Sequence, residues 1–497
     1  MRGADVRERR LSSAASGRAL LPVRGAPASR GTGADRLLVW GTSLLVVWAT
    51  LAFGGVYPWA FWPLLAGVSL VGIMALASVP RTGTMLSSGL TVSLALAALA
   101  IVIQLIPVSS SLLQILSPNA DAYLRESNIA YAFERGSGPA WHPLSLSPRD
   151  TLRFLLFFVT LSLFVAGMAA VLARTGTRTL GGALAVIGVL VAALGISHAG
   201  DASGLVYGFW KPVEGGNAIF GPFVNKNHFA GWMAMALGVV LGTLCGRLVR
   251  LRHPRARGLR ARLLQLVSDN ASKLWLNALA ASIMALSLVM TASRSGVGAL
   301  LAATVILGVF VLRRQRTSRR GLLAAGVLVA VVGVALLWGG PDRLLARFQN
   351  LPGSNVGGRL AVWRDTARMS LDFPLTGVGM NSYGRAMLRY QRGGQEPFFA
   401  AHNDYLQLLA EGGLLVSVPF LMVLAFFVRE VVRRFAERQD DARTYWIRAG
   451  AVSGLGAIAL QEIVDFSLQI PANALLFCVL GAIAIHRPVP RPPGEVR

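Results

Sequence analysis

The chain has 497 residues, of which 54% are hydrophobic and only 14% are charged, and its formal net charge is +25. Soluble domains carry about 25% charged residues, so this composition excludes an ordinary cytosolic enzyme and predicts a protein embedded in a bilayer. The excess of Lys and Arg raises nucleic-acid binding as an alternative, which the positions of these residues decide.

The N-terminal residues 1–36 are rich in Arg, Ala, Gly and Ser and contain no long apolar stretch, which predicts a disordered cytoplasmic tail. No short apolar core with a small-residue cleavage site precedes the first apolar run, so we expect that run to stay in the membrane as an anchor. Cys245 and Cys478 form no CxxC pair, which predicts neither a disulfide framework nor a thiolate metal site.

About twelve apolar runs are long enough to cross a bilayer core, which needs about 20 helical residues. The sequence therefore predicts an all-α, polytopic membrane protein whose transmembrane domain covers residues 37–486. The expected spans are residues 37–54, 60–79, 88–107, 153–173, 180–199, 229–248, 273–292, 296–312, 321–339, 412–428, 447–465 and 468–486.

The orientation of the spans follows from the basic residues. If the N-terminus is cytoplasmic, 33 of the 48 Lys and Arg residues fall on the cytoplasmic side and 15 on the outer side. This is the asymmetry of the positive-inside rule, and it places the C-terminal tail, residues 487–497, in the cytoplasm. With the acidic residues included, the inner side carries +24 and the outer side +1, so the net charge indicates orientation rather than nucleic-acid binding.

The outer side then holds four connections, and the last is about 70 residues long, far beyond an ordinary connection. The four segments are residues 108–152, 200–228, 293–295 and 340–411. The long segment contains eight arginines and no lysine, including Arg343, Arg347 and Arg392. Three further pairs have the i, i+4 spacing of one helix face: Arg359 and Trp363, Arg364 and Arg368, and Arg385 and Arg389.

Arginine is suited to binding phosphate because its planar guanidinium pairs bidentately with phosphate oxygens and stays charged. The functional interpretation of this loop is therefore a diphosphate grip. The alternative is a solvated face, or contact with outer-leaflet lipid.

The same loop ends in Ala401-His402-Asn403-Asp404-Tyr405, which leads into the tenth span. A histidine at the water boundary is placed to act as a general base for a hydroxyl nucleophile. The alternative is that His402 only caps or hydrogen-bonds a helix end. Asn403 and Tyr405 beside it favour a functional site that binds substrate.

Two further outer segments carry polar side chains. Asn225, Lys226, Asn227 and His228 open the sixth span, where either asparagine alone would serve as a helix cap; the functional alternative is contact with sugar or phosphate oxygens. Arg294 lies in the tight turn after the seventh span and needs a counter-ion, which a lipid headgroup would supply without catalysis.

Glu462 and Asp465 lie three residues apart near the outer end of the eleventh span. We expect them to pair with the outer-loop arginines; the alternative is a proton path. The sequence contains no P-loop, GxSxG elbow or HExxH motif, so it predicts a reaction that needs no metal ion and no cofactor.

These motifs together resemble the O-antigen ligase and O-antigen polymerase superfamily of bacterial membrane glycosyltransferases. The resemblance covers roughly residues 150–470 and depends on four motifs in order: Gly221–Gly231, Ser293-Arg294-Ser295-Gly296, Arg359 with Trp363, and His402-Asn403-Asp404-Tyr405 leading to Glu411 and Gly413.

The resemblance implies a GT-C-like fold in the bacterial inner membrane with its active site facing the periplasm. It implies a metal-independent transfer of a glycan from an undecaprenyl diphosphate carrier to a saccharide acceptor, which is lipid A core or a growing polysaccharide. By similarity, Arg294 and Arg359 hold the diphosphate, and His402 activates the acceptor hydroxyl.

The motifs leave ligase, polymerase and protein O-oligosaccharyltransferase open, although Phe220–His228 and Asp465–Pro471 look more like the exopolysaccharide-type branch. A polysaccharide or lipid-carrier transporter (flippase) is the main alternative from another class. A transporter is expected to place ionisable groups near the bilayer midplane, whereas here they collect at the outer boundary, which favours the enzyme.

Overall fold

The computed structural model describes most of the chain. The described residues are 31–79, 86–138, 140–200, 203–213, 219–250, 269–315, 318–338, 353–392, 397–437 and 442–488. Most of the expected N-terminal tail, residues 489–497 of the C-terminal tail, and Arg343 and Arg347 lie outside them.

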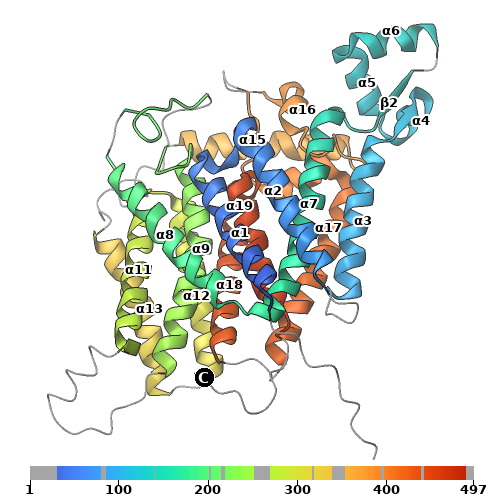
Figure 1. Ribbon diagram of the computed structural model, residues 1–497. Helices are drawn as coiled ribbons and strands as arrows, with labels where there is room; N and C mark the ends of the chain where they lie inside the picture. The colour runs from blue at the N-terminus through green and yellow to red at the C-terminus, as the bar shows by residue number, and fades with distance from the viewer. Residues whose placement is uncertain are drawn as a thin grey trace, which may run out of the picture.

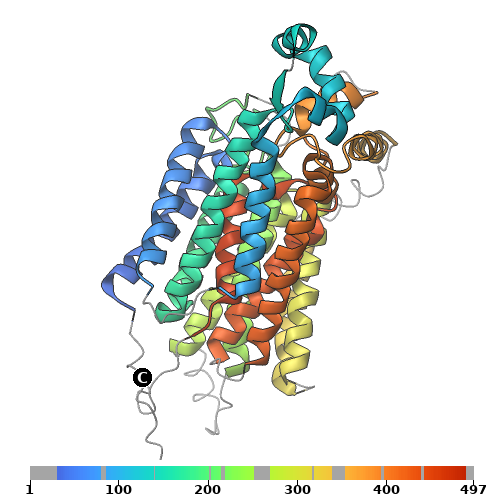
Figure 2. The same ribbon diagram turned by 90° about the vertical axis from the view of Figure 1, so that its right-hand side faces the viewer.

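The described residues form a bundle of α-helices with one two-stranded sheet, which confirms the predicted all-α polytopic fold. Twelve helices run side by side through the bundle (Figure 1, Figure 2). They are α1 (Gly33–Leu51), α2 (Pro58–Ala77), α3 (Ser88–Leu105), α7 (Pro148–Thr175), α8 (Arg178–Ser197), α9 (Lys226–Arg250), α11 (Asp269–Met290), α12 (Arg294–Gln315), α13 (Arg319–Trp338), α17 (Asp404–Ala436), α18 (Ala442–Gln461) and α19 (Pro471–Ile485).

The first helix begins inside the segment expected to be disordered. Thr32 and Asp35 form a capping box, in which the Thr32 hydroxyl accepts from the Asp35 amide at 3.1 Å and the Asp35 carboxylate accepts from the Thr32 amide at 2.8 Å. Arg174 also donates to the Asp35 carboxylate, so this ion pair joins the last turn of α7 to the first turn of α1. The expected tail is therefore wrong for residues 33–36, because this cap satisfies the first turn of α1.

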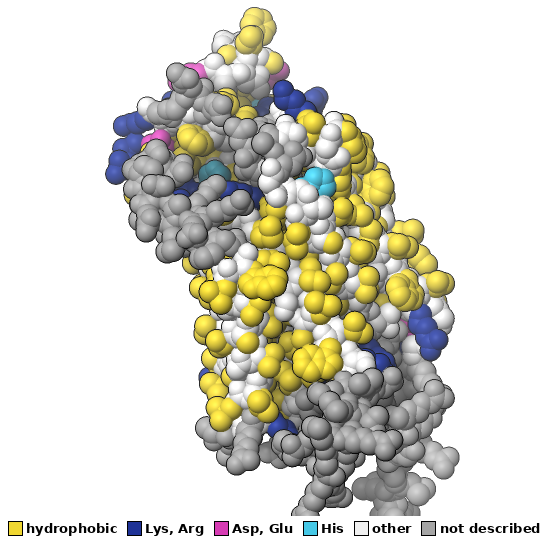
Figure 3. All heavy atoms as spheres, turned by 90° about the vertical axis from the view of Figure 1, so that its left-hand side faces the viewer, with side chains coloured by type: hydrophobic (Ala, Val, Ile, Leu, Met, Phe, Trp, Pro, Cys, Tyr) yellow, Lys and Arg dark blue, Asp and Glu magenta, His cyan; other side chains and the backbone are white. Residues whose placement is uncertain are grey.

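Ten of the described helices are long and apolar enough to cross a membrane, and each matches an expected span. Figure 3 shows hydrophobic side chains covering the middle of one face of the bundle, with charged side chains and histidines towards its ends. The other two expected spans correspond to α18 and α19, which are not among the ten. With 15 residues, α19 is about 22 Å long, shorter than a bilayer core of about 30 Å.

One end of the bundle is covered by shorter elements, and we call it the capped end (Figure 1). A first group follows α3: strand β1 (Pro107–Ser109), helices α4 (Ser110–Leu116), α5 (Pro118–Ser127) and α6 (Ile129–Ser137), and strand β2 (Trp141–Pro143), which pairs antiparallel with β1. A second group, α15 (Gly353–Asp372) and α16 (Tyr383–Tyr390), lies between α13 and α17, and α15 lies across the end of the bundle rather than along it.

Both groups share a buried apolar cluster that includes Leu113, Leu124, Val362 and Met387. All four connections expected on the outer side lie at the capped end where they are described, and the connections expected inside lie at the opposite end. The expected long loop is thus largely helical in its described part.

Helix α17 begins at Asp404, eight residues before the expected span, and is broken at Gly413, where φ is +54°. The turn after α15 satisfies the backbone groups at this break: the amides of Leu414 and Leu415 donate to Pro374 and Leu375 at 2.9 Å each. A broken helix is stable inside a membrane protein when neighbouring backbone replaces its hydrogen bonds, so this turn fixes how α15 meets α17.

Replacing Gly413 by alanine is expected to lower the thermal stability of the detergent-solubilised protein. A Cβ there would lie 2.5 Å from the Gly377 amide nitrogen, and a positive φ is strained for a residue with a side chain, at a cost of about 1–3 kcal/mol. Gly298→Ala is the control because its Cβ would meet nothing within 4 Å. Equal melting temperatures for the two variants would show that the break in α17 does not require glycine at position 413.

Helices α9 and α18 pack backbone to backbone through small residues. A Cβ at Gly238 would lie 2.7 Å from the Gly450 carbonyl oxygen, and one at Gly454 would lie 2.7 Å from the Met235 carbonyl oxygen. Spaced glycines of this kind allow membrane helices to approach closely. The close contact brings the first turn of α9 beside the segment that follows α18 at the capped end.

Candidate functional site

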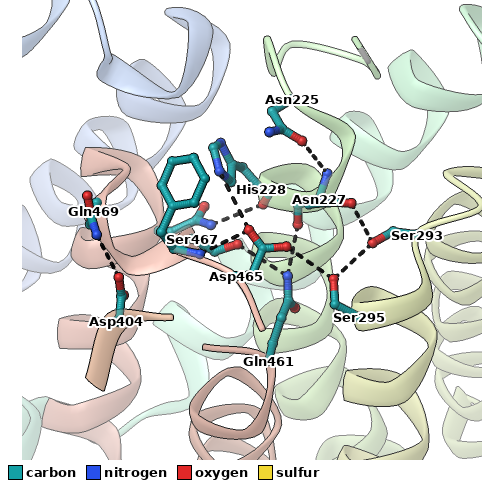
Figure 4. Close-up of polar contacts among 12 residues, drawn as sticks. Asn225, Asn227, His228, Ser293, Ser295, Asp404, Gln461, Asp465, Ser467 and Gln469 are labelled. Carbon is teal, nitrogen blue, oxygen red and sulfur yellow. Dashed lines mark hydrogen bonds and ion pairs between the residues drawn. The ribbon is translucent and has the colours of Figure 1, made fainter. Parts of the chain in front are cut away.

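Three segments that are far apart in sequence meet at the capped end. They are the start of α9 with Asn227 and His228, the turn between α11 and α12 with Ser293 and Ser295, and residues 461–473 between α18 and α19. Figure 4 shows their side chains directed toward one another. We call this group the polar network; its members are Asn227, His228, Ser293, Ser295, Gln461, Asp465, Ser467 and Asn473.

Hydrogen bonds connect all three segments of the polar network. The Ser293 hydroxyl donates to the Asn227 side-chain oxygen at 2.7 Å, and the Ser295 hydroxyl donates to Asp465 at 3.1 Å. Gln461 donates from its side-chain nitrogen to the Asn227 carbonyl oxygen at 3.0 Å and to the Ser467 hydroxyl at 3.2 Å (Figure 4). Hydrogen bonds between side chains of different segments restrict the movement of the groups that they join.

Asp465 is wholly buried at the centre of the polar network. Besides Ser295, its carboxylate accepts from the Phe466 amide at 2.9 Å, and its Oδ1 lies 4.0 Å from Nε2 of His228. Burial raises the pKa of Asp465, while the positive charge of Arg359 opposes that rise. Among the described residues no arginine makes an ion pair with Asp465 or Glu462, so the expected pairing is not seen there. Only the charge of Arg359 acts on Asp465.

His402 precedes α17 and is held by its chain neighbours. The Ala401 carbonyl accepts from the Trp363 ring nitrogen at 3.0 Å, and the Asn403 side chain caps α17 by accepting from the Leu406 amide at 3.0 Å. His402 itself has a φ of +51°, a left-handed conformation that is uncommon for a residue with a side chain. These contacts hold a strained residue in place, which is frequent at functional sites.

The His402 imidazole is half-buried, and its Nδ1 is buried without a hydrogen-bond partner among the described residues. Burial, together with the nearby Arg359, lowers the pKa of His402 to about 4. The ring is therefore neutral at pH 7 and able to accept a proton.

Arg359 and Arg294 differ from the other expected arginines. Both are half-buried, and neither makes an ion pair or hydrogen bond with another described residue. Arg359 extends from α15, and its charge acts on both His402 and Asp465. Arg294 lies between the two serines of the polar network. A guanidinium group without a partner among the described residues is suited to binding an anion.

Two of the exposed arginines of the same region are already paired with acidic residues. Arg385 lies 3.6 Å from Asp150, and Arg389 lies 3.3 Å from Glu126. Arg364 is exposed on α15 and Arg392 lies beyond the end of α16. The regular spacing of Arg385 and Arg389 thus reflects contacts with the first turn of α7 and with α5.

Several remaining expected site residues have structural partners. Asn225 caps α9, accepting from the Asn227 amide at 2.9 Å, and the Tyr405 hydroxyl donates to the Ala459 carbonyl at 2.7 Å. His228 is 3% exposed and therefore buried below the surface of the protein, whereas Lys226 and Trp363 are half-buried.

A carboxyl pair next to His402 was not expected. The Asp404 amide donates to the Glu462 carbonyl at 3.0 Å, and the Asp404 carboxylate accepts from Gln469 at 2.7 Å. Burial and the nearby Asp404 raise the pKa of Glu462. Sequence reasoning also missed Gln461 and Gln469. The signal that could have found them is that both lie inside expected apolar spans, residues 447–465 and 468–486, where polar side chains are unusual.

Comparison with known protein families identifies the region that holds these groups. A family model described as O-antigen ligase matches residues 279–421, which include Arg294, Arg359 and His402. The match extends from the middle of α11 to residue 421 of α17, beyond the break at Gly413, and leaves out the start of α9 and residues 461–473. No curated protein matches the chain. The matched region, 143 of the 497 residues, together with the helical, multi-pass fold, supports the resemblance of this chain to the O-antigen ligase and polymerase superfamily.

Proposed function

We propose that the protein transfers a glycan from undecaprenyl diphosphate to a hydroxyl group of a saccharide acceptor. The observation that carries the proposal is the geometry of His402: its φ is +51°, its Nδ1 is buried without a partner among the described residues, and its ring centroid lies 4.9 Å from that of Phe466, the residue after Asp465. The charge of Arg359 acts on both His402 and Asp465. The family match supplies the reaction class.

In the proposed reaction the acceptor hydroxyl attacks the anomeric carbon of the carrier-bound glycan. A new glycosidic C–O bond forms, the bond from the anomeric carbon to the diphosphate oxygen breaks, and undecaprenyl diphosphate leaves with that electron pair. The acceptor proton passes to His402. The developing charge on the diphosphate is stabilised by the positive charges of Arg359 and Arg294.

The proposed substrate contacts surround these three catalytic residues. Lys226, Asn227 and Trp363 are half-buried at the capped end, and we assign them to substrate contact. Arg364 and Tyr405 are exposed at the same end and are further proposed substrate contacts. Arg385 and Arg389 contribute mainly to the packing of the capped end, because acidic residues already pair with them. Nothing in this scheme uses a metal ion or a cofactor.

The proposed location is the bacterial inner membrane, with both termini in the cytoplasm and the capped end in the periplasm. The distribution of basic residues along the sequence supports this orientation, since 33 of 48 belong to segments expected on the cytoplasmic side. In this arrangement residues 37–486 form one transmembrane domain, and the segment 340–411 carries the periplasmic catalytic residues.

Mass spectrometry of the lipid carrier in a deletion strain tests the proposal. A ligase is expected to leave complete polymer on undecaprenyl diphosphate, and a polymerase to leave single repeat units on it. Carrier-linked glycan that is confined to the cytoplasmic leaflet would indicate a transporter and contradict the proposal. The same strain complemented with the intact chain is the control.

A further inference from the structure

Phe466 occupies a position that the proposed reaction does not yet use. Its ring centroid lies 4.9 Å from that of His402 and 4.8 Å from that of His228, and both contacts are edge-on, with interplanar angles of 74° and 79°. The two imidazoles come from different elements, the start of α17 and the first turn of α9. Phe466 thus lies between two histidine rings.

The backbone of Phe466 is fixed by the polar network. Its amide donates to Asp465 at 2.9 Å, and its carbonyl accepts from the Gln469 amide at 3.2 Å. His228, behind it, is held in turn through its carbonyl, which accepts from the Asn473 side chain at 3.0 Å. Phe466 is therefore a rigid surface against which the His402 ring packs.

His402 needs such a surface because no hydrogen bond from a described residue orients its ring. Its Nδ1 is buried without a partner, and the residue has a positive φ. A ring held only by packing is expected to rotate, and to become more hydrated, when that packing is removed.

We propose that Phe466, backed by His228, is a positioning residue that orients the His402 imidazole toward the acceptor hydroxyl and excludes water from its inner side. This proposal rests on the proposed function of His402 as a base. It assigns His228 to supporting Phe466, rather than to the substrate contact expected from the sequence.

The charged groups around His402 determine the effect that losing Phe466 would have. Arg359 of α15 lowers the pKa of His402, His228 of α9 is buried near it, and Asp404, Glu462 and Asp465 surround the same end of α17. Burial contributes most to the low pKa of His402. Water entering beside the ring removes part of that contribution, so the pKa is expected to rise from about 4 toward the ordinary value of 6.5.

The test is histidine-selective NMR titration of the full-length protein in detergent micelles, which is practical because the chain has six histidines. The His402 signal is assigned with His402→Gln. In Phe466→Leu the His402 midpoint is expected to move upward by at least one pH unit, while Phe466→Tyr, which keeps the ring, leaves it near the wild-type value. Phe373→Leu is the control, because Phe373 is buried at the capped end without a ring contact to either histidine.

Activity gives a second readout. Phe466→Leu is expected to lower kcat by about 3- to 10-fold with an unchanged KM for the lipid donor, and to move the acid limb of the pH–rate profile upward. A base works only when neutral, so activity falls as the pH drops through its pKa, and a higher pKa moves that fall to higher pH.

If Phe466→Leu does not fold, His228→Ala removes the support behind Phe466 and is expected to shift the same midpoint by a smaller amount. An unchanged His402 midpoint in the folded variants, or an equal shift in Phe373→Leu, would overturn the positioning role. That outcome differs from failure of the proposed function, in which the midpoint shifts but His402→Ala still transfers glycan.

Discussion

Alanine at position 402 is expected to lower turnover by about 10²- to 10⁴-fold, the range usually lost with a general acid or base. The loss follows because no other described imidazole has access to the site: His228 is 3% exposed and lies behind Phe466. The measurement is the rate of transfer of a glycan from purified undecaprenyl diphosphate donor by the reconstituted protein. Donor binding is expected to change little, since the diphosphate is held by arginines.

His142→Ala is the matched control for this experiment. His142 lies in β2 at the capped end, packs edge-on against Tyr131, and belongs to neither the polar network nor the surface around His402. Its replacement is expected to leave the rate within a factor of about two. Wild-type turnover in His402→Ala at normal protein level would exclude His402 as the base.

Lysine at position 359 is expected to be far more harmful than a charge-conserving change at an exposed site, lowering kcat by about 10²- to 10³-fold. Lysine keeps one positive charge but loses the planar fork that contacts two phosphate oxygens at once. The charge of Arg359 also acts on His402 and Asp465, so its displacement changes both groups. Single-turnover kinetics separate the transfer step from donor binding.

Arg368→Lys is the control on the same helix. Arg368 pairs with Asp365 at 2.9 Å and is 40% exposed, so lysine can keep that ion pair with little loss. If the two lysine variants have equal transfer rates, Arg359 is one more solvated arginine of α15 and holds no diphosphate.

The membrane helices were predictable because each long apolar run in the sequence forms one helix, and every expected span matches a helix of the bundle. The ends of α17 were not predictable. Its first turns contain Gln407 and Glu411, which sequence assigns to a loop, yet both are buried: Gln407 donates to Glu411 at 3.3 Å, and Glu411 accepts from the Tyr383 amide at 2.9 Å. Polar residues in a helix are satisfied here by partners from another element.

The candidate site was predictable in its chemistry but not in its packing. His402, Arg359 and Arg294 stand out in sequence because charged or titratable side chains beside a membrane are costly without a function. Phe466 has no such signal, since one phenylalanine near an apolar span is ordinary, and only the fold brings it between two histidines.

The arginines show the same limit. From helical spacing alone, Arg385 and Arg389 were predicted to bind substrate as Arg359 was. Their acidic partners, Asp150 and Glu126, lie more than 200 residues earlier in the chain, so the spacing could not reveal them. Helical periodicity reports which residues share a face and carries no information on what that face meets.

The most direct test of the account is the release of undecaprenyl diphosphate by the purified protein in liposomes, supplied with undecaprenyl diphosphate-linked glycan and acceptor. The account predicts one undecaprenyl diphosphate released for each glycan joined to acceptor, with release slowed by about 10²- to 10⁴-fold in His402→Ala. Intact donor that only moves between leaflets, with no diphosphate released, would contradict it.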